Sequence, residues 1–167
     1  RTLIGKLAAK IYGDHIYAAR GLGLDRYDLR LEGQIQRISG ECGPAAFTQD
    51  SHPIRGWITA LAEHAGGLLA AVWNPDNKTT YICRGFDRLT VGVPGPGPVV
   101  WYGAEVVIKP AAGVGKMVTR MHVGSPAVTS GTALQAIKQY LWLGLLSSAG
   151  GQPTIDYVEL PNAGGPL

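Results

Sequence analysis

Two residues in the first third of the chain have the types and spacing of a thiol nucleophile and an oxyanion donor. Cys42 is followed by Gly-Pro-Ala-Ala, and Gln36 stands six residues before it. Proline favours the first turn of a helix, so the pattern predicts a helix with Cys42 at its N-terminal cap. The positive end of a helix favours the thiolate, which is the nucleophilic form of cysteine. The Gln36 amide and the Cys42 backbone N–H could then stabilise an oxyanion.

A cysteine nucleophile also needs a base and a group that orients this base. His122 follows Cys42 by 80 residues and lies in an expected strand over residues 117–123. Asp156, in an expected last strand over residues 154–160, is the acid that could orient its imidazole. Each residue also has a structural interpretation, because a lone cysteine is often a small buried residue and a histidine in an apolar strand is often part of the core.

Gln36, five intervening residues and Cys42-Gly-Pro-Ala-Ala together resemble the papain-like cysteine peptidases, especially the group that matures bacterial leader peptides. The resemblance implies helices after the cysteine, followed by a sheet that carries the catalytic His and Asp. The family's Asp would fall within residues 132–138, which contain no acid. Asp156 is therefore the substitute, and the family's fold could also be present without its activity.

The expected elements support the same fold class. Amphipathic patterns predict helices over residues 2–12 and 54–64, and a capping box at Thr132 and Gln135 predicts a third that ends at Gly150. Apolar runs bounded by turn residues predict strands over residues 15–19, 68–73, 79–84, 89–93, 99–108, 117–123 and 154–160. This order predicts an α+β, papain-like domain with N-terminal helices packed on a C-terminal antiparallel sheet. It would be a single domain over residues 1–167, excised or processed from a longer chain.

Composition limits the partners. The net charge is +3 and no Lys/Arg run occurs, so no nucleic acid is expected as a partner. The longest apolar run, residues 140–146, is too short to span a membrane. Cys42 and Cys83 are the only cysteines and form no metal-ligand cluster, so no metal or organic cofactor is expected. A disulfide between them and two separate thiols both stay open, as do compartment and oligomeric state.

Two other classes of protein fit parts of the chain. An ADP-ribosyltransferase-like toxin domain would use Arg20 to hold NAD phosphates and Glu105 to stabilise the oxocarbenium ion, with both residues in one cleft. A non-catalytic binding or assembly module would use Trp57, Trp73, Trp101 and Trp142 with a Gly/Pro-rich surface and would show an exposed apolar patch.

The sequence favours a thiol-dependent hydrolase, a peptidase or a protein deamidase, that acts on a protein or peptide substrate. Cys42 would attack the carbonyl, His122 would act as base and then acid, Gln36 would hold the oxyanion, and Asp156 would orient His122.

Overall fold

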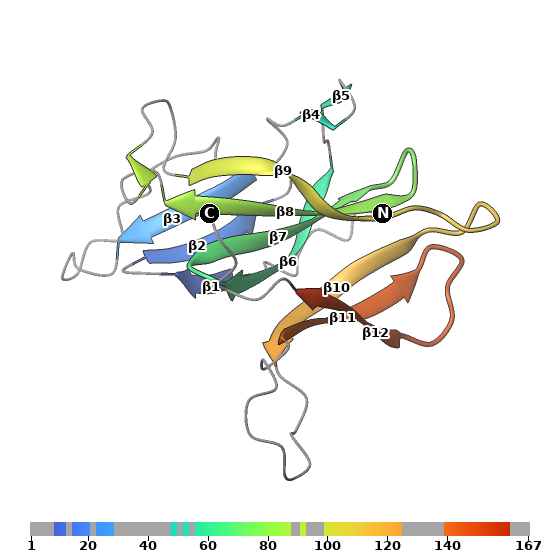
Figure 1. The fold of residues 1–167 in the computed structure, drawn as a ribbon. Helices are drawn as coiled ribbons and strands as arrows, with labels where there is room; N and C mark the ends of the chain where they lie inside the picture. Colours follow the sequence, from blue (N-terminus) through green and yellow to red (C-terminus); the bar gives the residue numbers. More distant parts are fainter. Residues whose placement is uncertain are drawn as a thin grey trace, which may run out of the picture.

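Antiparallel β-sheet makes up nearly all the regular structure of the residues that can be described (Figure 1). The computed structural model describes residues 9–12, 15–20, 23–28, 48–49, 52–53, 56–87, 91–92, 99–124 and 139–160. All twelve elements in these ranges are strands.

The strands form three main sheets, each connected in chain order. The N-terminal sheet contains β1 (Ala9–Tyr12), β2 (His15–Arg20) and β3 (Gly23–Asp28). The central sheet contains β6 (Trp57–His64), β7 (Gly67–Asn74), β8 (Thr79–Asp87) and β9 (Val99–Ile108). The C-terminal sheet contains β10 (Lys116–Gly124), β11 (Gln139–Ser147) and β12 (Thr154–Leu160). The short strands β4 (Thr48–Gln49) and β5 (His52–Pro53) pair with each other.

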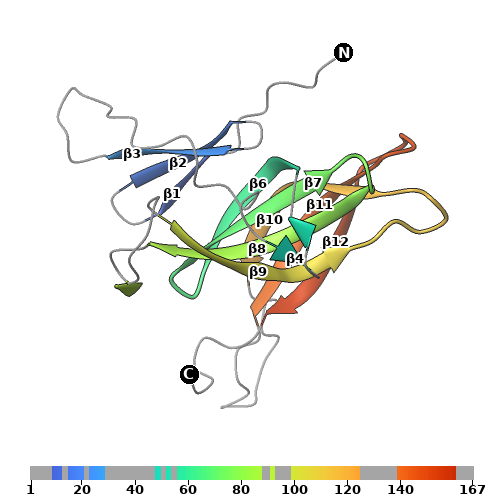
Figure 2. The same cartoon turned by 90° about the horizontal axis from the view of Figure 1, so that it is seen from above.

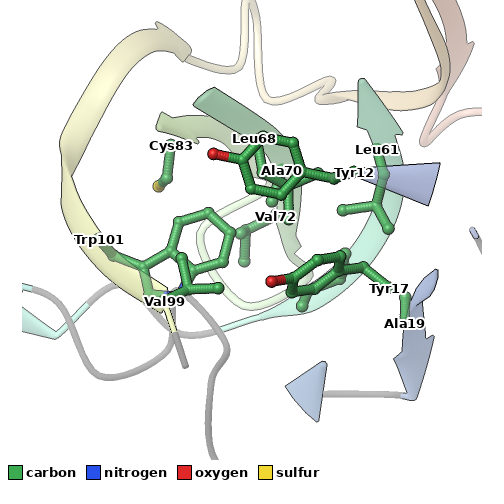
Figure 3. Close-up of a cluster of buried hydrophobic side chains, with 11 residues drawn as sticks. Tyr12, Tyr17, Ala19, Leu61, Leu68, Ala70, Val72, Cys83, Val99 and Trp101 are labelled. Carbon is green, nitrogen blue, oxygen red and sulfur yellow. The ribbon is translucent and has the colours of Figure 1, made fainter. Parts of the chain in front are cut away.

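The central sheet is covered on both faces, which gives the molecule two hydrophobic cores (Figure 2). The first core lies between the N-terminal and central sheets, where Tyr12 and Tyr17 face Val99 and Trp101 (Figure 3). The second lies between the central and C-terminal sheets and contains Ala60, Ala62, Leu69, Ala71, Ile82, Val118, Leu141, Leu143, Leu145 and Leu160. Because β7 contributes to both cores, its residues 68–72 are all apolar and fully buried.

Tight turns join neighbouring strands. Ala65 and Gly66 connect β6 to β7 with φ angles of 51° and 70°. Two successive residues with positive φ are the conformation of a type I′ hairpin, whose twist matches that of the flanking strands. Between β7 and β8, the Asn74 side chain accepts hydrogen bonds from the backbone N–H groups of Asp76 and Asn77, which closes the loop.

The predicted α+β, papain-like fold with N-terminal helices is wrong for the described residues. The end of the expected helix over residues 2–12 forms β1, and residues 57–64 of the second expected helix form β6. Strand β6 is apolar towards both cores, with Ile58 and Leu61 in the first core and Ala60 and Ala62 in the second. A strand that is buried on both faces lacks the period of two, so its apolar residues also match a helical period.

The third expected helix is also wrong where the structure describes it, since residues 139–147 form β11. Leu141, Leu143 and Leu145 are buried in alternation with partly or largely exposed residues. That alternation is the period of a half-buried strand and prevails over the capping box upstream. The strands predicted over residues 15–19, 68–73, 79–84, 99–108, 117–123 and 154–160 are confirmed. The strand predicted over residues 89–93 is wrong at residues 91–92, the part of it that the structure describes.

Candidate functional site: the outer face of the C-terminal sheet

The face of the C-terminal sheet that points away from the second core is defined by the strand register. Residues that lie directly opposite each other on neighbouring strands share a face, and successive residues alternate between faces. Since Leu141, Leu143 and Leu145 enter the core, the residues between them on β11 point outward. We call this surface the outer face.

The outer face carries three rows of side chains that cross the sheet. The middle row is His122, Trp142 and Tyr157; one flanking row is Gly124, Tyr140 and Glu159, and the other is Arg120, Gly144 and Ile155. Three aromatic rings therefore meet on two adjacent strands. Arginine and histidine border them on β10, and glutamate and isoleucine border them on β12.

The three rings contact one another. The centroid of the Tyr157 ring lies 5.3 Å from that of Trp142 and 5.4 Å from that of Tyr140, and the Tyr140 and Trp142 centroids are 6.4 Å apart. These are the spacings of directly packed aromatic pairs, so the rings form a continuous ridge without room for a ligand between them. We call Tyr140, Trp142 and Tyr157 the aromatic ridge.

The aromatic ridge is open to solvent. Tyr157 is 56% exposed, Trp142 is 36% exposed, and the neighbouring Ile155 is 78% exposed. Single exposed apolar residues are normal on a protein surface, whereas a contiguous group of large ones marks an interaction site. This surface can bind a partner by covering the rings from above.

A second cluster of polar side chains lies at the margin of the second core. Arg84 on β8 is buried, and its Nε and Nη2 donate hydrogen bonds to the two carboxylate oxygens of Glu105. Its Nη1 also donates to the backbone carbonyl of His64, at 2.6 Å. The guanidinium therefore joins β6, β8 and β9.

His64 extends this cluster to the C-terminal sheet. Its Nδ1 lies 3.0 Å from Arg84 Nη2, which can only donate, and its Nε2 lies 2.8 Å from the Gln139 Oε1 acceptor. Burial, followed by the nearby Arg84 charge, lowers the pKa of His64, which keeps the ring neutral. Because both ring nitrogens are engaged, His64 acts as a cross-link and not as a base for substrate.

The structure does not bring His122 and Asp156 together. His122 lies opposite Trp142 and points to the outer face. Asp156 lies opposite Leu143, whose side chain is in the second core, so Asp156 points to the other face of the sheet. Cys42 and Gln36 lie outside the described residues, so their place relative to His122 stays a prediction.

Arg20 and Glu105, the residues of the transferase alternative, are also placed apart. The Glu105 carboxylate binds Arg84, which shares the central-sheet face of Leu69, a residue of the second core. Arg20 ends β2, whose sheet packs on the opposite face through Tyr17 and Ala19. The ion pair with Arg84 accounts for Glu105 without any ligand.

Cys83 is a free, fully buried thiol in the first core. Burial, together with the negative charge of Glu105, raises the pKa of Cys83 to about 12. We therefore expect Cys83 to be unreactive towards iodoacetamide at pH 7.5 in the folded protein and to react only in denaturant. The measurement is mass spectrometry of the labelled Cys42→Ser variant, in which Cys83 is the only thiol. Rapid labelling of that folded variant would contradict the buried position.

Sequence reasoning missed Tyr140, Tyr157 and Ile155 as functional residues. The signal was present in the alternation of residues 140–145, where Leu141, Leu143 and Leu145 alternate with Tyr140, Trp142 and Gly144. In the last strand, Ile155 and Tyr157 likewise alternate with the polar residues Thr154 and Asp156. The helical interpretation of residues 132–149 hid it, because alternate residues do not share a helix face.

No protein-family model, curated protein or solved structure matches this chain. Among the described residues, no helix is long and apolar enough to cross a membrane. Within the same ranges, His, Cys, Asp and Glu side chains do not gather in groups of three or more that could hold a metal ion.

Proposed function

We propose that the chain is a non-catalytic binding module whose outer face docks a partner protein. The observation that carries this proposal is the contact-packed, solvent-exposed aromatic ridge beside the exposed Ile155. Tryptophan and tyrosine are enriched among the residues that dominate the binding energy of protein interfaces, and here Trp142 and Tyr157 lie side by side on one face. The hydrolase hypothesis stays a prediction that depends on Cys42 and Gln36.

A protein fits this face better than a single-stranded nucleic acid. Bases also stack on exposed aromatic rings, but such sites combine the rings with a positively charged groove. On the outer face, the positive Arg120 is accompanied by the negative Glu159. Ile155, the most exposed large hydrophobic residue described, offers an aliphatic contact that suits a protein core patch.

Site-specific photo-cross-linking tests this function in the cells that make the protein. The photoreactive amino acid p-benzoylphenylalanine is placed at position 120 on the outer face and, as a control, at position 76 in the β7–β8 turn. We expect a discrete protein adduct from position 120 and none from position 76. Combined with Trp142→Ser, the adduct should fall by about tenfold or more, since truncation of a hot-spot residue costs about 2 kcal/mol or more.

Circular dichroism and the thermal midpoint serve as the folding control, because Trp142 lies on the outer face and contributes to neither core. Equal adducts from both positions, or an adduct that Trp142→Ser leaves unchanged, would refute the proposal. An adduct that is degraded by nuclease would show that the partner is a nucleic acid and would refute the proposal of a protein partner.

A further inference from the structure

Strand β12 forms one margin of the C-terminal sheet (Figure 1). In the ranges that the structure describes, it pairs with β11 along its whole length, Thr154–Leu160, and with no other strand. The side chains of residues 154–157 are all exposed. One edge of β12 is therefore accessible together with the aromatic ridge.

One hydrogen bond shows which backbone groups face this edge. The N–H of Tyr157 donates to Oδ1 of Asp156 at 2.9 Å, so it is directed away from the β11 ladder. The N–H and C=O of one residue in an antiparallel strand point to the same side, and residues alternate. Ile155 and Tyr157 thus present their peptide groups at the edge, whereas Asp156 and Val158 bond to β11.

The ring geometry agrees with this assignment. Trp142 and Tyr157 are then a non-hydrogen-bonded pair, the kind in which opposite side chains lie closer together. Their rings are indeed in contact, with centroids 5.3 Å apart.

Of the features that oppose strand addition at natural edges, β12 has its charged residues, Asp156 and Glu159, of which Asp156 points to the core side of the sheet. Natural edge strands use lysine, proline or bulges for this purpose. Strand β12 contains neither proline nor lysine, and its register with β11 runs without a shift. Its protection is Asp156, whose carboxylate occupies the N–H of Tyr157.

The charge of β12 selects the incoming strand. When a backbone carbonyl of the partner accepts the hydrogen bond of the Tyr157 N–H, it displaces the Asp156 carboxylate. A cationic side chain of the partner would then stabilise this carboxylate. Strand β12 carries Asp156 and Glu159 and no Lys or Arg, so a second copy paired to this edge would add two further carboxylates and no cation. Like charges on paired strands are destabilising, and opposite charges are stabilising.

We infer that the partner protein adds an extended, basic segment to the edge of β12, with a Lys or Arg side chain paired to Asp156 and a neighbouring side chain on the aromatic ridge. This inference rests on the proposed function of the outer face. Main-chain hydrogen bonds to Ile155 and Tyr157 supply affinity, and the alternating side chains supply specificity.

Three synthetic heptapeptides test the edge. One alternates Lys with Val, a second alternates Glu with Val, and the third is the Lys peptide N-methylated at its Val residues, whose N–H groups would face β12 when Lys pairs with Asp156. Isothermal titration calorimetry should show that the Lys peptide binds about tenfold or more tightly than the Glu peptide, and that N-methylation abolishes binding. Hydrogen exchange should slow at the Ile155 and Tyr157 amides. Asp156→Lys should reverse the preference to the Glu peptide.

Ile155→Pro separates this inference from the proposed function. Proline removes an N–H that faces the edge, so the β11 ladder and the aromatic ridge are retained, and Lys-peptide binding should be lost. Equal binding of the N-methylated or the Glu peptide, or failure of the Lys peptide to bind, overturns the inference. If the position-120 adduct nevertheless persists and depends on Trp142, the outer face binds its partner without strand addition, and the proposed function stands.

Discussion

Glu105→Ala is expected to lower the free energy of unfolding by about 3 kcal/mol. The substitution leaves the Arg84 guanidinium buried without its carboxylate, and removal of one partner of a buried ion pair costs about 3–5 kcal/mol. The lower end applies because the Glu105 side chain is 34% exposed and solvent screens part of its charge. Urea unfolding followed by far-UV circular dichroism gives this difference.

Two control variants test whether the stability loss of Glu105→Ala comes from the broken ion pair. Asp76→Ala removes an exposed carboxylate from the β7–β8 turn and should change stability by about 0.5 kcal/mol or less. The double variant Arg84→Met/Glu105→Leu removes both charges and with them the desolvation cost, but it also removes the hydrogen bonds from Arg84 to the carbonyl and ring of His64, so it should recover only part of the stability that Glu105→Ala loses. A loss for Glu105→Ala no larger than that for Asp76→Ala would show that the ion pair contributes nothing.

The strands with clear boundaries could be predicted from the sequence. Residues 154–160 match β12 at both ends, because Pro153 precedes them and Pro161 follows them. The β7–β8 hairpin was predictable from two apolar runs around a loop that contains Asn74 and Pro75. Local composition suffices where turns delimit a strand.

The three-layer arrangement could not be predicted in this way. Strand β6 is buried on both faces, and its apolar spacing fits a helix as well as a strand. Whether this segment forms a helix or a strand depends on the sheets that cover its two faces, and these sheets come from distant parts of the sequence. The aromatic ridge was hidden for the same reason, since its rings come from two strands that become neighbours only through the fold.

Gly85→Ala is expected to destabilise the protein by about 3 kcal/mol through overpacking of the first core. A Cβ at position 85 would lie 2.5 Å from Val99 Cγ1 and 2.7 Å from Trp101 Cε3. Both of these side chains are buried between two sheets, so neither can move into solvent. Extra carbon in a well-packed core costs about 1–3 kcal/mol, and the upper end applies when the obstructing atoms cannot shift.

Gly124→Ala is the matched control, because a Cβ there would lie at ordinary contact distances, 3.4 Å from the His122 ring and 3.8 Å from Trp142 Nε1, and we expect a change of about 0.5 kcal/mol or less. Coupling with Val99→Ala identifies the clash. Val99→Ala alone leaves a cavity. In the Gly85→Ala background it also removes the closest obstructing atom, so the double variant should lose less stability than the sum of the losses of the two single variants. If the two losses were strictly additive, Gly85 would be required for its backbone conformation. Its lack of a side chain would then not be needed to make room for Val99 and Trp101.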